Sequence, residues 1–332
     1  MNCPKCNTIA EADSNFCEEC GTPLKALPAG VAQKMGVCEC GAGPDKIGED
    51  GFCEVCGLKV KNSVSDHVEV ELSPLVAGVS DSGKRHFQNE DSFCVHREKE
   101  TVIAVVCDGV SVSQNPDQAS QCAASAAKDS LAESAVKPNP DFNQAMRDAI
   151  RRADAAVKQV SFIPDLEEID PPSSTIIAVI VVPSAGSGKT KKAIIGWLGD
   201  SRAYYFTNKA NTLLTKDHSW ANEIVEAGEM SYEEAIKDAR SHRLTRTLGG
   251  YPAKAGTEMD EPGIIEADLS ATGWLILCTD GVWNYADSGE DLAKIFHAMP
   301  KTATALETAK FLTEWANAQG GKDNVSVVAL AV

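Results

Sequence analysis

The stretch VIVVPSAGSGKTKKAIIGWLGDSRAYYF, residues 179–206, distinguishes two possible folds for this chain. Its glycine-rich centre contains Gly188-Lys189-Thr190, which resembles the end of a phosphate-binding loop. That loop needs the pattern G-x-x-x-x-G-K-[ST] followed by a helix. Pro183 stands where the first glycine is required, and a proline has no N–H to offer a phosphate. The residues after the loop are rich in Ile, Trp and Tyr, which is typical of a strand. We therefore predict a hairpin with a surface loop at 184–192, and no nucleotide site.

Composition limits the classes of partner. The chain has 332 residues, 43% of them hydrophobic, and a formal net charge of −17. An acidic chain does not favour nucleic acid or an anionic membrane surface, because both attract basic faces. No apolar run approaches the ~18 residues of a membrane span, and the first residues lack the features of a signal peptide. We expect a cytoplasmic protein that binds neither nucleic acid nor membrane.

The chain divides into three parts. Residues 1–60 are poor in aliphatic runs and cannot bury much core alone. Residues 61–73 mix polar and β-branched residues and are predicted to be a linker that leads into a first strand. Residues 74–332 contain blocks of strands and blocks of Ala-rich helices, rather than a strict alternation of the two. That pattern favours an α+β domain over a doubly wound sheet.

Eight of the twelve cysteines lie before residue 57, in four close pairs. Two C-x2-C turns can complete a tetrahedron of thiolates around zinc, and only one of the four pairs departs from this spacing. Disulfides are disfavoured in a cytoplasmic chain, whereas ligand softness does not exclude iron. We predict two structural zinc ions, held by Cys3, Cys6, Cys17 and Cys20 and by Cys38, Cys40, Cys53 and Cys56.

The cysteine pattern resembles a double zinc ribbon. Such modules often bind nucleic acid, but residues 1–60 carry nine acidic side chains against five lysines. Binding to phosphates would need positive charge. A role in protein interaction, or as a structural cap, is therefore favoured for this module.

Acidic turns recur at the ends of strand-like runs. Single Asp-Gly turns are common strand-end turns and carry little functional information. Several carboxylates gathered at one end of a sandwich would repel one another, and hard divalent cations are the usual compensation. The turns are Asn89-Glu90-Asp91, Asp108-Gly109, Asp200, Asp280-Gly281 and Asp323-Asn324.

The order of these motifs resembles the metal-dependent Ser/Thr protein phosphatase family, phosphatase type 2C. The resemblance runs from about residue 75 to residue 332. It implies a four-layer αββα sandwich, in which two packed antiparallel sheets are flanked by helices. The motifs that carry it are RHFQNED, DGV, PSSTIIAVI, GDSRAYYF, LTKDHS, LTRTLGG, CTDGVW and KDNVSVV.

The resemblance implies a dinuclear Mg²⁺ or Mn²⁺ centre and hydrolysis of phosphoserine and phosphothreonine by a metal-bridging hydroxide. Asp108 would bridge the two ions, and the carbonyl of Gly109 would bind one of them. Asp280 and Asp323 would hold the other. Two cations lower the pKa of a bridging water and neutralise charge on the phosphate, and oxygen ligands suit Mg²⁺ or Mn²⁺ better than zinc.

Further roles follow from the same resemblance. Glu90 and Asp91 would act mainly through metal-bound water, and Asp200 would help to hold a third, weaker ion. Arg85 would hold the phosphate, since a guanidinium can grip two phosphate oxygens. The activity implies phosphoprotein substrates and a cognate Ser/Thr kinase pathway.

The sequence departs from the family pattern at several positions. Many members have D-G-x-G-G, some with a histidine at x as the proposed acid, whereas this chain has Val110-Ser111-Val112. Leaving-group protonation must therefore come from metal-bound water or another residue. His86 stands where the family commonly has its arginine, which makes it an alternative to Arg85. Asn284 replaces a frequent aspartate and weakens the case for a third metal.

Two further expectations concern the segment after the hairpin. Asp217 or Ser219 is predicted to cap the following helix, and the insertion from Ser219 to Gly250 is expected near the active site, where it would help to choose substrates. The altered 110–112 segment also supports a rival hypothesis. In it the protein is a catalytically weak pseudophosphatase that binds phosphoproteins as a scaffold through its zinc ribbons.

Overall fold

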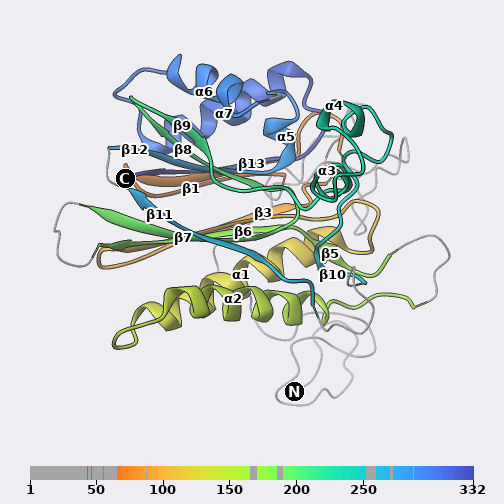
Figure 1. Ribbon diagram of the computed structural model, residues 1–332, viewed down its shortest axis with the longest axis horizontal. Coiled ribbons are helices and arrows are strands. Elements are labelled where there is room, and N and C mark those ends of the chain that lie inside the picture. The colour runs from red at the N-terminus through yellow and green to blue at the C-terminus, as the bar shows by residue number, and fades with distance from the viewer. Residues whose placement is uncertain are drawn as a thin grey trace.

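The computed structural model describes Gly43, Lys46, Val55 and residues 66–332, except 87, 165–169, 185–189, 252–258, 270–271 and 287. The described residues form two sheets packed face to face, with helices on both outer faces (Figure 1). The predicted α+β sandwich of two antiparallel sheets and flanking helices is confirmed. All eight zinc-ligand candidates lie outside the described residues.

One sheet has six strands in the order β1-β2-β13-β12-β8-β9. Neighbouring strands are antiparallel throughout. These strands are β1 His67–Ser73, β2 Val76–Asp81, β13 Val325–Ala331, β12 Gly273–Cys278, β8 Arg202–Thr207 and β9 Asn211–Leu213.

The other sheet has five antiparallel strands in the order β11-β7-β6-β4-β3. They are β11 Gly263–Leu269, β7 Lys191–Leu198, β6 Ile176–Pro183, β4 Thr101–Asp108 and β3 Asp91–Glu98. A two-stranded ribbon lies at one end of the sandwich, where β5 Ser173–Ser174 pairs with β10 Leu248–Gly249.

The strands are apolar on both faces because each sheet is covered on both sides. In β6, Ile176, Ala178 and Ile180 pack against helices. The alternate residues Ile177 and Val179 pack between the sheets. A continuous apolar run of this kind is typical of a strand in the centre of a sandwich.

Two long helices cover the five-stranded sheet, namely α1 Pro116–Ala135 and α2 Phe142–Val157. The six-stranded sheet is covered by α6 Gly289–His297 and α7 Ala305–Gln319. Cys107 and Cys278 lie in strands β4 and β12 as small core residues and are both fully buried. Three short helices, α3 Trp220–Glu226, α4 Tyr232–Ala235 and α5 Asp280–Trp283, lie at one end of the sandwich (Figure 1).

The hairpin that was predicted from residues 179–206 is present. Strands β6 and β7 pair directly, with Pro183 opposite Lys191, and the Ser184 N–H donates to the Thr190 carbonyl at 2.9 Å. A strand therefore follows the loop where a P-loop would need a helix. The segment predicted as linker contributes more to the domain than expected, because His67–Ser73 is strand β1 and pairs with β2.

Candidate active site

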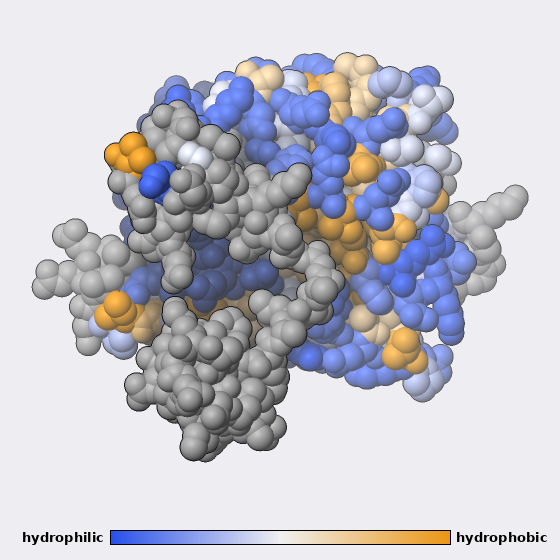
Figure 2. Space-filling view, turned by 180° about the vertical axis from the view of Figure 1, so that it is seen from behind, coloured by the Kyte–Doolittle hydropathy of each residue, from blue (hydrophilic) through white to orange (hydrophobic). Residues whose placement is uncertain are grey.

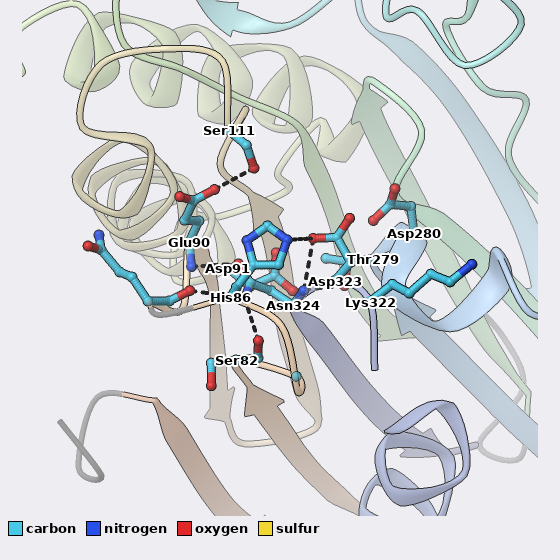
Figure 3. A network of polar contacts seen from close by, with 12 residues as sticks. Ser82, His86, Glu90, Asp91, Ser111, Thr279, Asp280, Lys322, Asp323 and Asn324 are labelled. Carbon is cyan, nitrogen blue, oxygen red and sulfur yellow. Dashed lines mark hydrogen bonds and ion pairs between the residues drawn. The ribbon is translucent and has the colours of Figure 1, made fainter. Parts of the chain in front are cut away.

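Four strand ends bring acidic residues to one end of the sandwich. Asp91 begins β3 and Asp108 ends β4, and the two residues are directly opposite each other in the antiparallel ladder. In the other sheet, Asp280 follows β12 and Asp323 precedes β13. Because the ends of antiparallel neighbours meet at the same edge, each pair of turns is brought together by strand pairing alone. Packing of the sheets then brings the two pairs together, as Figure 3 shows for Asp91, Asp280 and Asp323.

Asn324 fastens the turn before β3 to the turn before β13. Its side-chain amide donates to the carbonyls of Ser82 at 2.9 Å and Gln88 at 3.0 Å. Its Oδ1 accepts from the backbone N–H of Glu90 at 2.8 Å. The Asn324 side chain is buried, so these three bonds replace water that it has lost. This one side chain therefore fixes where Glu90 and Asp91 enter the site.

The Asp91 carboxylate is held on one oxygen and unpartnered on the other. Its Oδ2 accepts from the hydroxyl of Thr279 at 2.8 Å, and the same hydroxyl accepts from the backbone N–H of Ser326 at 3.0 Å. Asp91 Oδ1 is buried without a hydrogen-bond partner among the described residues. A buried acceptor of this kind costs free energy unless another group satisfies it.

Gly109 follows Asp108 at a point where no side chain fits. A Cβ there would meet the backbone oxygens of Pro116 and Glu90. The Gly109 N–H also donates to the Glu90 carbonyl at 3.1 Å. Glycine is therefore required here because two other segments approach its backbone closely.

A cavity of about 900 Å³ opens at this end of the sandwich. Asp108, Asp280 and Asp323 line it together with Asp200 and Gly109, whereas Asp91 and Glu90 do not reach its wall. The remaining lining residues are Val110, Ser111, Thr175, Arg202, Tyr232, Ile236, His242, Leu244, Gly281, Trp283, Asn284, Tyr285 and Lys322.

Four carboxylates of this site have a raised pKa and so resist ionisation. Burial, and then the neighbouring Asp280 and Asp323, raise the pKa of Asp91 well above its usual value. Burial and the surrounding carboxylates do the same for the pKa of Asp108 and of Asp200. Burial, followed by the charge of Asp323, raises the pKa of Asp280 to about 6. The shared cause is negative charge concentrated in a space with little water.

The donor set fits a hard divalent cation. The candidate ligands are all oxygens, one of them is unpartnered, and Asp280 and Asp108 are close enough for a hydrogen bond between their carboxyl groups. Among the described residues, no three His, Cys, Asp or Glu side chains already form a closed ligand cluster. Mutual repulsion opposes such a cluster until positive charge is present.

Asp200 reaches the cavity from the turn between β7 and β8. Its carbonyl accepts from the indole N–H of Trp283 at 3.0 Å. The guanidinium of Arg202 lies 3.7 Å from the centre of the Trp283 ring. Asn284, which replaces an aspartate common in the family, donates its amide to Asp280 Oδ2 at 2.9 Å.

Neither Arg85 nor His86 lies in the cavity wall. Arg85 is exposed on the turn after β2. His86 Nε2 lies 3.4 Å from Asp323 Oδ1, so His86 is directed at a candidate ligand (Figure 3). Of the two, His86 is the one whose side chain contacts the carboxylate cluster.

The prediction that Asp217 or Ser219 caps α3 by its side chain is wrong. Asp217 instead forms a paired ion bridge with Arg202, with N–O distances of 3.0 Å and 2.6 Å. Ser219 occupies the N-cap position but makes no side-chain bond to the helix. Asp217 pairs with Arg202 of β8 instead of the N-terminus of α3, because a buried guanidinium needs a carboxylate partner.

The insertion lies where it was expected. Tyr232, Ile236, His242 and Leu244 from this segment line the same cavity as the aspartates. Ser111, which replaces a family glycine, donates its hydroxyl to Glu90 Oε2 at 2.5 Å. Sequence reasoning did not find Ser111, His242 or Lys322 as wall residues, since none has a spacing that marks it.

Among the described residues on the face shown in Figure 2, most are hydrophilic, and hydrophobic ones gather in smaller patches. No helix among the described residues is long and apolar enough to cross a membrane.

Comparison with known proteins agrees with this geometry. The family model for protein phosphatase 2C matches residues 78–325. The serine/threonine phosphatase stp of Listeria welshimeri is 28% identical over 254 residues, which cover 75% of this chain and 92% of the relative.

Solved structures agree as well. The serine/threonine phosphatase PstP/Ppp of Mycobacterium tuberculosis is 27% identical, with a TM-score of 0.58, and the match covers 77% of this chain and 97% of that one. A structure of the PstP catalytic domain in complex with two manganese ions is 26% identical, with a TM-score of 0.55 and the same coverage. The family match spans most of the chain and contains every candidate carboxylate of the cavity. The chain therefore belongs to the protein phosphatase 2C family of serine/threonine phosphatases.

Proposed function

We propose that this phosphatase hydrolyses phosphoserine and phosphothreonine in proteins at a dinuclear Mn²⁺ or Mg²⁺ centre. The observation that carries the proposal is the gathering of Asp108, Asp200, Asp280 and Asp323 from both sheets around one cavity. Four carboxylates in one wall are unfavourable without a cation. The two manganese ions of the similar PstP structure support the same assignment.

The proposed ligands divide between the two sheets. Asp108, Asp280 and Asp323 would hold the ions with their carboxylates, and Gly109 would contribute its backbone carbonyl. Asp91 lies behind the wall, and its unpartnered oxygen would accept a hydrogen bond from water held there. When bound, the ions supply activated water near neutral pH and offset the charge of the phosphate.

Other residues of the chain position the centre and the substrate. Glu90 is held by Ser111 and by its backbone bond to Asn324. Arg85 grips the phosphate from the exposed turn, and Lys322 supplies a second cation in the cavity wall. Asp200 would help to hold a third, weaker ion, and Asn284 in place of an aspartate lowers the negative charge available to that ion.

The test is phosphate release from a phosphothreonine peptide with Mn²⁺, Mg²⁺ or EDTA. Wild type should turn over only with a divalent ion, and Asp108→Asn should lower kcat by at least ~100-fold, since it removes the shared ligand. Asp268→Asn, an exposed carboxylate on β11, is the matched control and should keep wild-type activity. A folded wild type that is inactive with every ion would favour the pseudophosphatase scaffold instead.

We further propose that residues 1–60 form a double zinc ribbon, which is joined through the residues before β1 to a phosphatase domain that begins with this strand. The support is the spacing of the eight cysteines. The module would act in protein interaction or as a structural cap, and the substrates of the enzyme would be phosphoproteins made by a cognate kinase. Native mass spectrometry should show two zinc ions per chain, and fewer than two would refute the two-site assignment.

A further inference from the structure

The cavity wall lacks the acid that many family members place after the Asp-Gly turn, because Val110 carries no proton to donate. We propose that His242, on the inserted segment, protonates the serine or threonine oxygen that leaves during hydrolysis. The inference rests on the proposed function and adds a catalytic residue to it.

His242 lies in the right wall for this role. It lines the same cavity as Asp108 and Asp280. Its ring stacks on Trp283, with ring centres 6.3 Å apart and planes at 29°. Trp283 is buried, and its indole N–H bonds to the Asp200 carbonyl. The imidazole is therefore placed against a fixed aromatic surface at the edge of the carboxylate cluster.

Backbone hydrogen bonds hold the His242 segment to the sandwich. The Trp220 N–H donates to the Arg243 carbonyl at 2.8 Å, and the Thr245 N–H donates to the His218 carbonyl at 3.0 Å. The His218 N–H in turn donates to the Gly199 carbonyl at 2.9 Å. Gly199 directly precedes Asp200, so a short chain of bonds joins the acid's segment to the cavity wall.

The ring nitrogens of His242 are free to act. In the part of the chain that the structure describes, they have no hydrogen-bond or ion-pair partner, and the residue is exposed to solvent that can return a proton. The charged groups around it in the cavity wall are Asp108, Asp200, Arg202, Asp280, Lys322 and Asp323.

Other candidates are already engaged. His86 lies 3.4 Å from Asp323 and is absent from the cavity wall. Burial, followed by the charge of Arg246, lowers the pKa of His218 to about 4, so His218 carries no acidic proton at neutral pH. The hydroxyl proton of Ser111 is donated to Glu90. Among the described residues, His242 is the histidine in this wall with an uncommitted ring.

Bonds and protons are conserved in the proposed step. A bond forms between phosphorus and the oxygen of water, and the bond between phosphorus and the serine or threonine oxygen breaks. The leaving oxygen takes the ring proton of His242 and departs as an alcohol. Water loses one proton to solvent, and solvent returns one proton to the neutral imidazole. The products are the alcohol and inorganic phosphate.

Leaving-group dependence tests this role. A good leaving group needs no proton, whereas an alkoxide does, and an acid typically contributes about 10²–10⁴-fold. With Mn²⁺ and the full-length protein, His242→Gln should lower kcat about 100-fold on a phosphothreonine peptide. The same substitution should also lower kcat on phenyl phosphate, but it should change kcat on p-nitrophenyl phosphate by less than about twofold. Added imidazole should restore part of the phenyl phosphate activity in His242→Ala.

The control is His96→Gln, on β3 and outside the cavity wall, which should match wild type on all three substrates. Equal kcat for His242→Gln and wild type, or an equal loss on every leaving group, would overturn the proposal. A loss confined to the peptide, with both aryl phosphates unchanged, would also overturn it and indicate a peptide contact instead. A wild type inactive on every substrate would refute the proposed function itself.

Discussion

At the scale of single residues, the negative charges of the site favour the binding of a cation but lower the stability of the metal-free fold. The folded-state pKa of Asp280 is about 6, above the ordinary aspartate value. Asp280 therefore stabilises the fold fully only below the unfolded pKa of ~4, and this contribution is lost as the pH rises through about 6. In EDTA at pH 7, Asp280→Asn should raise the Tm, and the gain should vanish near pH 4.

Thermal unfolding followed by circular dichroism measures this effect. The amide oxygen introduced by Asp280→Asn can still accept the bond from Asn284, so packing is retained. The exposed Asp268→Asn serves as the control and should leave the Tm unchanged. A lower Tm for Asp280→Asn in EDTA at pH 7 would show that repulsion does not dominate the metal-free site.

The contribution of His218 to the stability of the fold should depend on pH in the opposite direction. Its folded pKa of about 4 lies below the ordinary 6.5, because burial disfavours the charged ring. Its Nδ1 also accepts from the Gly199 N–H at 3.3 Å, which requires that nitrogen to be unprotonated. As the pH falls from 6.5 toward 4, the unfolded chain binds the proton more readily, and stability is lost.

The expected loss is roughly 3 kcal/mol when the pH has fallen through the whole window. His218→Asn keeps an acceptor but cannot be protonated, so its stability should fall less between pH 7 and pH 5. Urea denaturation at both pH values measures the difference, with His96→Asn as the control. Identical pH dependence in wild type and His218→Asn would contradict the assignment.

At the scale of elements, the turns depend on one buried amide. Asn324→Ala would leave the Glu90 N–H and the Ser82 and Gln88 carbonyls without their partner. Unsatisfied buried groups cost about 1–3 kcal/mol each. We expect a loss of about 2–4 kcal/mol in the free energy of unfolding, together with a lower kcat. Urea denaturation and phosphate release measure both, and the exposed Asn208→Ala should change neither.

Removal of the inserted segment should affect phosphopeptides more than p-nitrophenyl phosphate, because the segment carries both cavity-wall residues for substrate choice and the proposed acid His242. Replacing residues 220–246 with a short Gly-Ser loop keeps β10, which pairs with β5, but removes Tyr232, Ile236 and His242 from the cavity wall. Activity on phosphopeptides should fall and their order of preference should change, while p-nitrophenyl phosphate is spared. The ratio of kcat/KM values measures this. Equal losses on both kinds of substrate would show that the segment supports the site as a whole.

At the scale of the whole molecule, the cation should join the two sheets. Asp108 comes from one sheet and Asp280 from the other, so metal binding stabilises only the packed sandwich. An ion at 100 times its Kd adds ≈2.7 kcal/mol, which corresponds to about 5–10 °C in a domain of this size. Mn²⁺ should raise the Tm of wild type and of Asp268→Asn by this amount, and that of Asp108→Asn much less. An equal shift in Asp108→Asn would place the ion elsewhere.

Local patterns were sufficient for most of the elements. The β-rich residues after Lys189 excluded a helix there and so predicted the hairpin, and the Ala-rich periodic segments predicted α1 and α2. The strand-end aspartates could be identified for a similar reason, because Asp-Gly turns follow or precede apolar runs. Sequence reasoning failed where partners are distant in the chain. Asp217 pairs with Arg202, fifteen residues away, and not with the helix beside it.

The sequence by itself determined which residues form strands, which carboxylates stand at their ends and which family the motifs resemble. These features depend on periodicity and turn chemistry, which act between near neighbours. Only the tertiary structure decided that four of those carboxylates share one cavity and that His242 and Lys322 complete its wall. It also decided that Asn324 fixes the turn before β3. Such contacts join residues that are up to about 240 positions apart in sequence, and they arise from the packing of sheets, which no local pattern encodes.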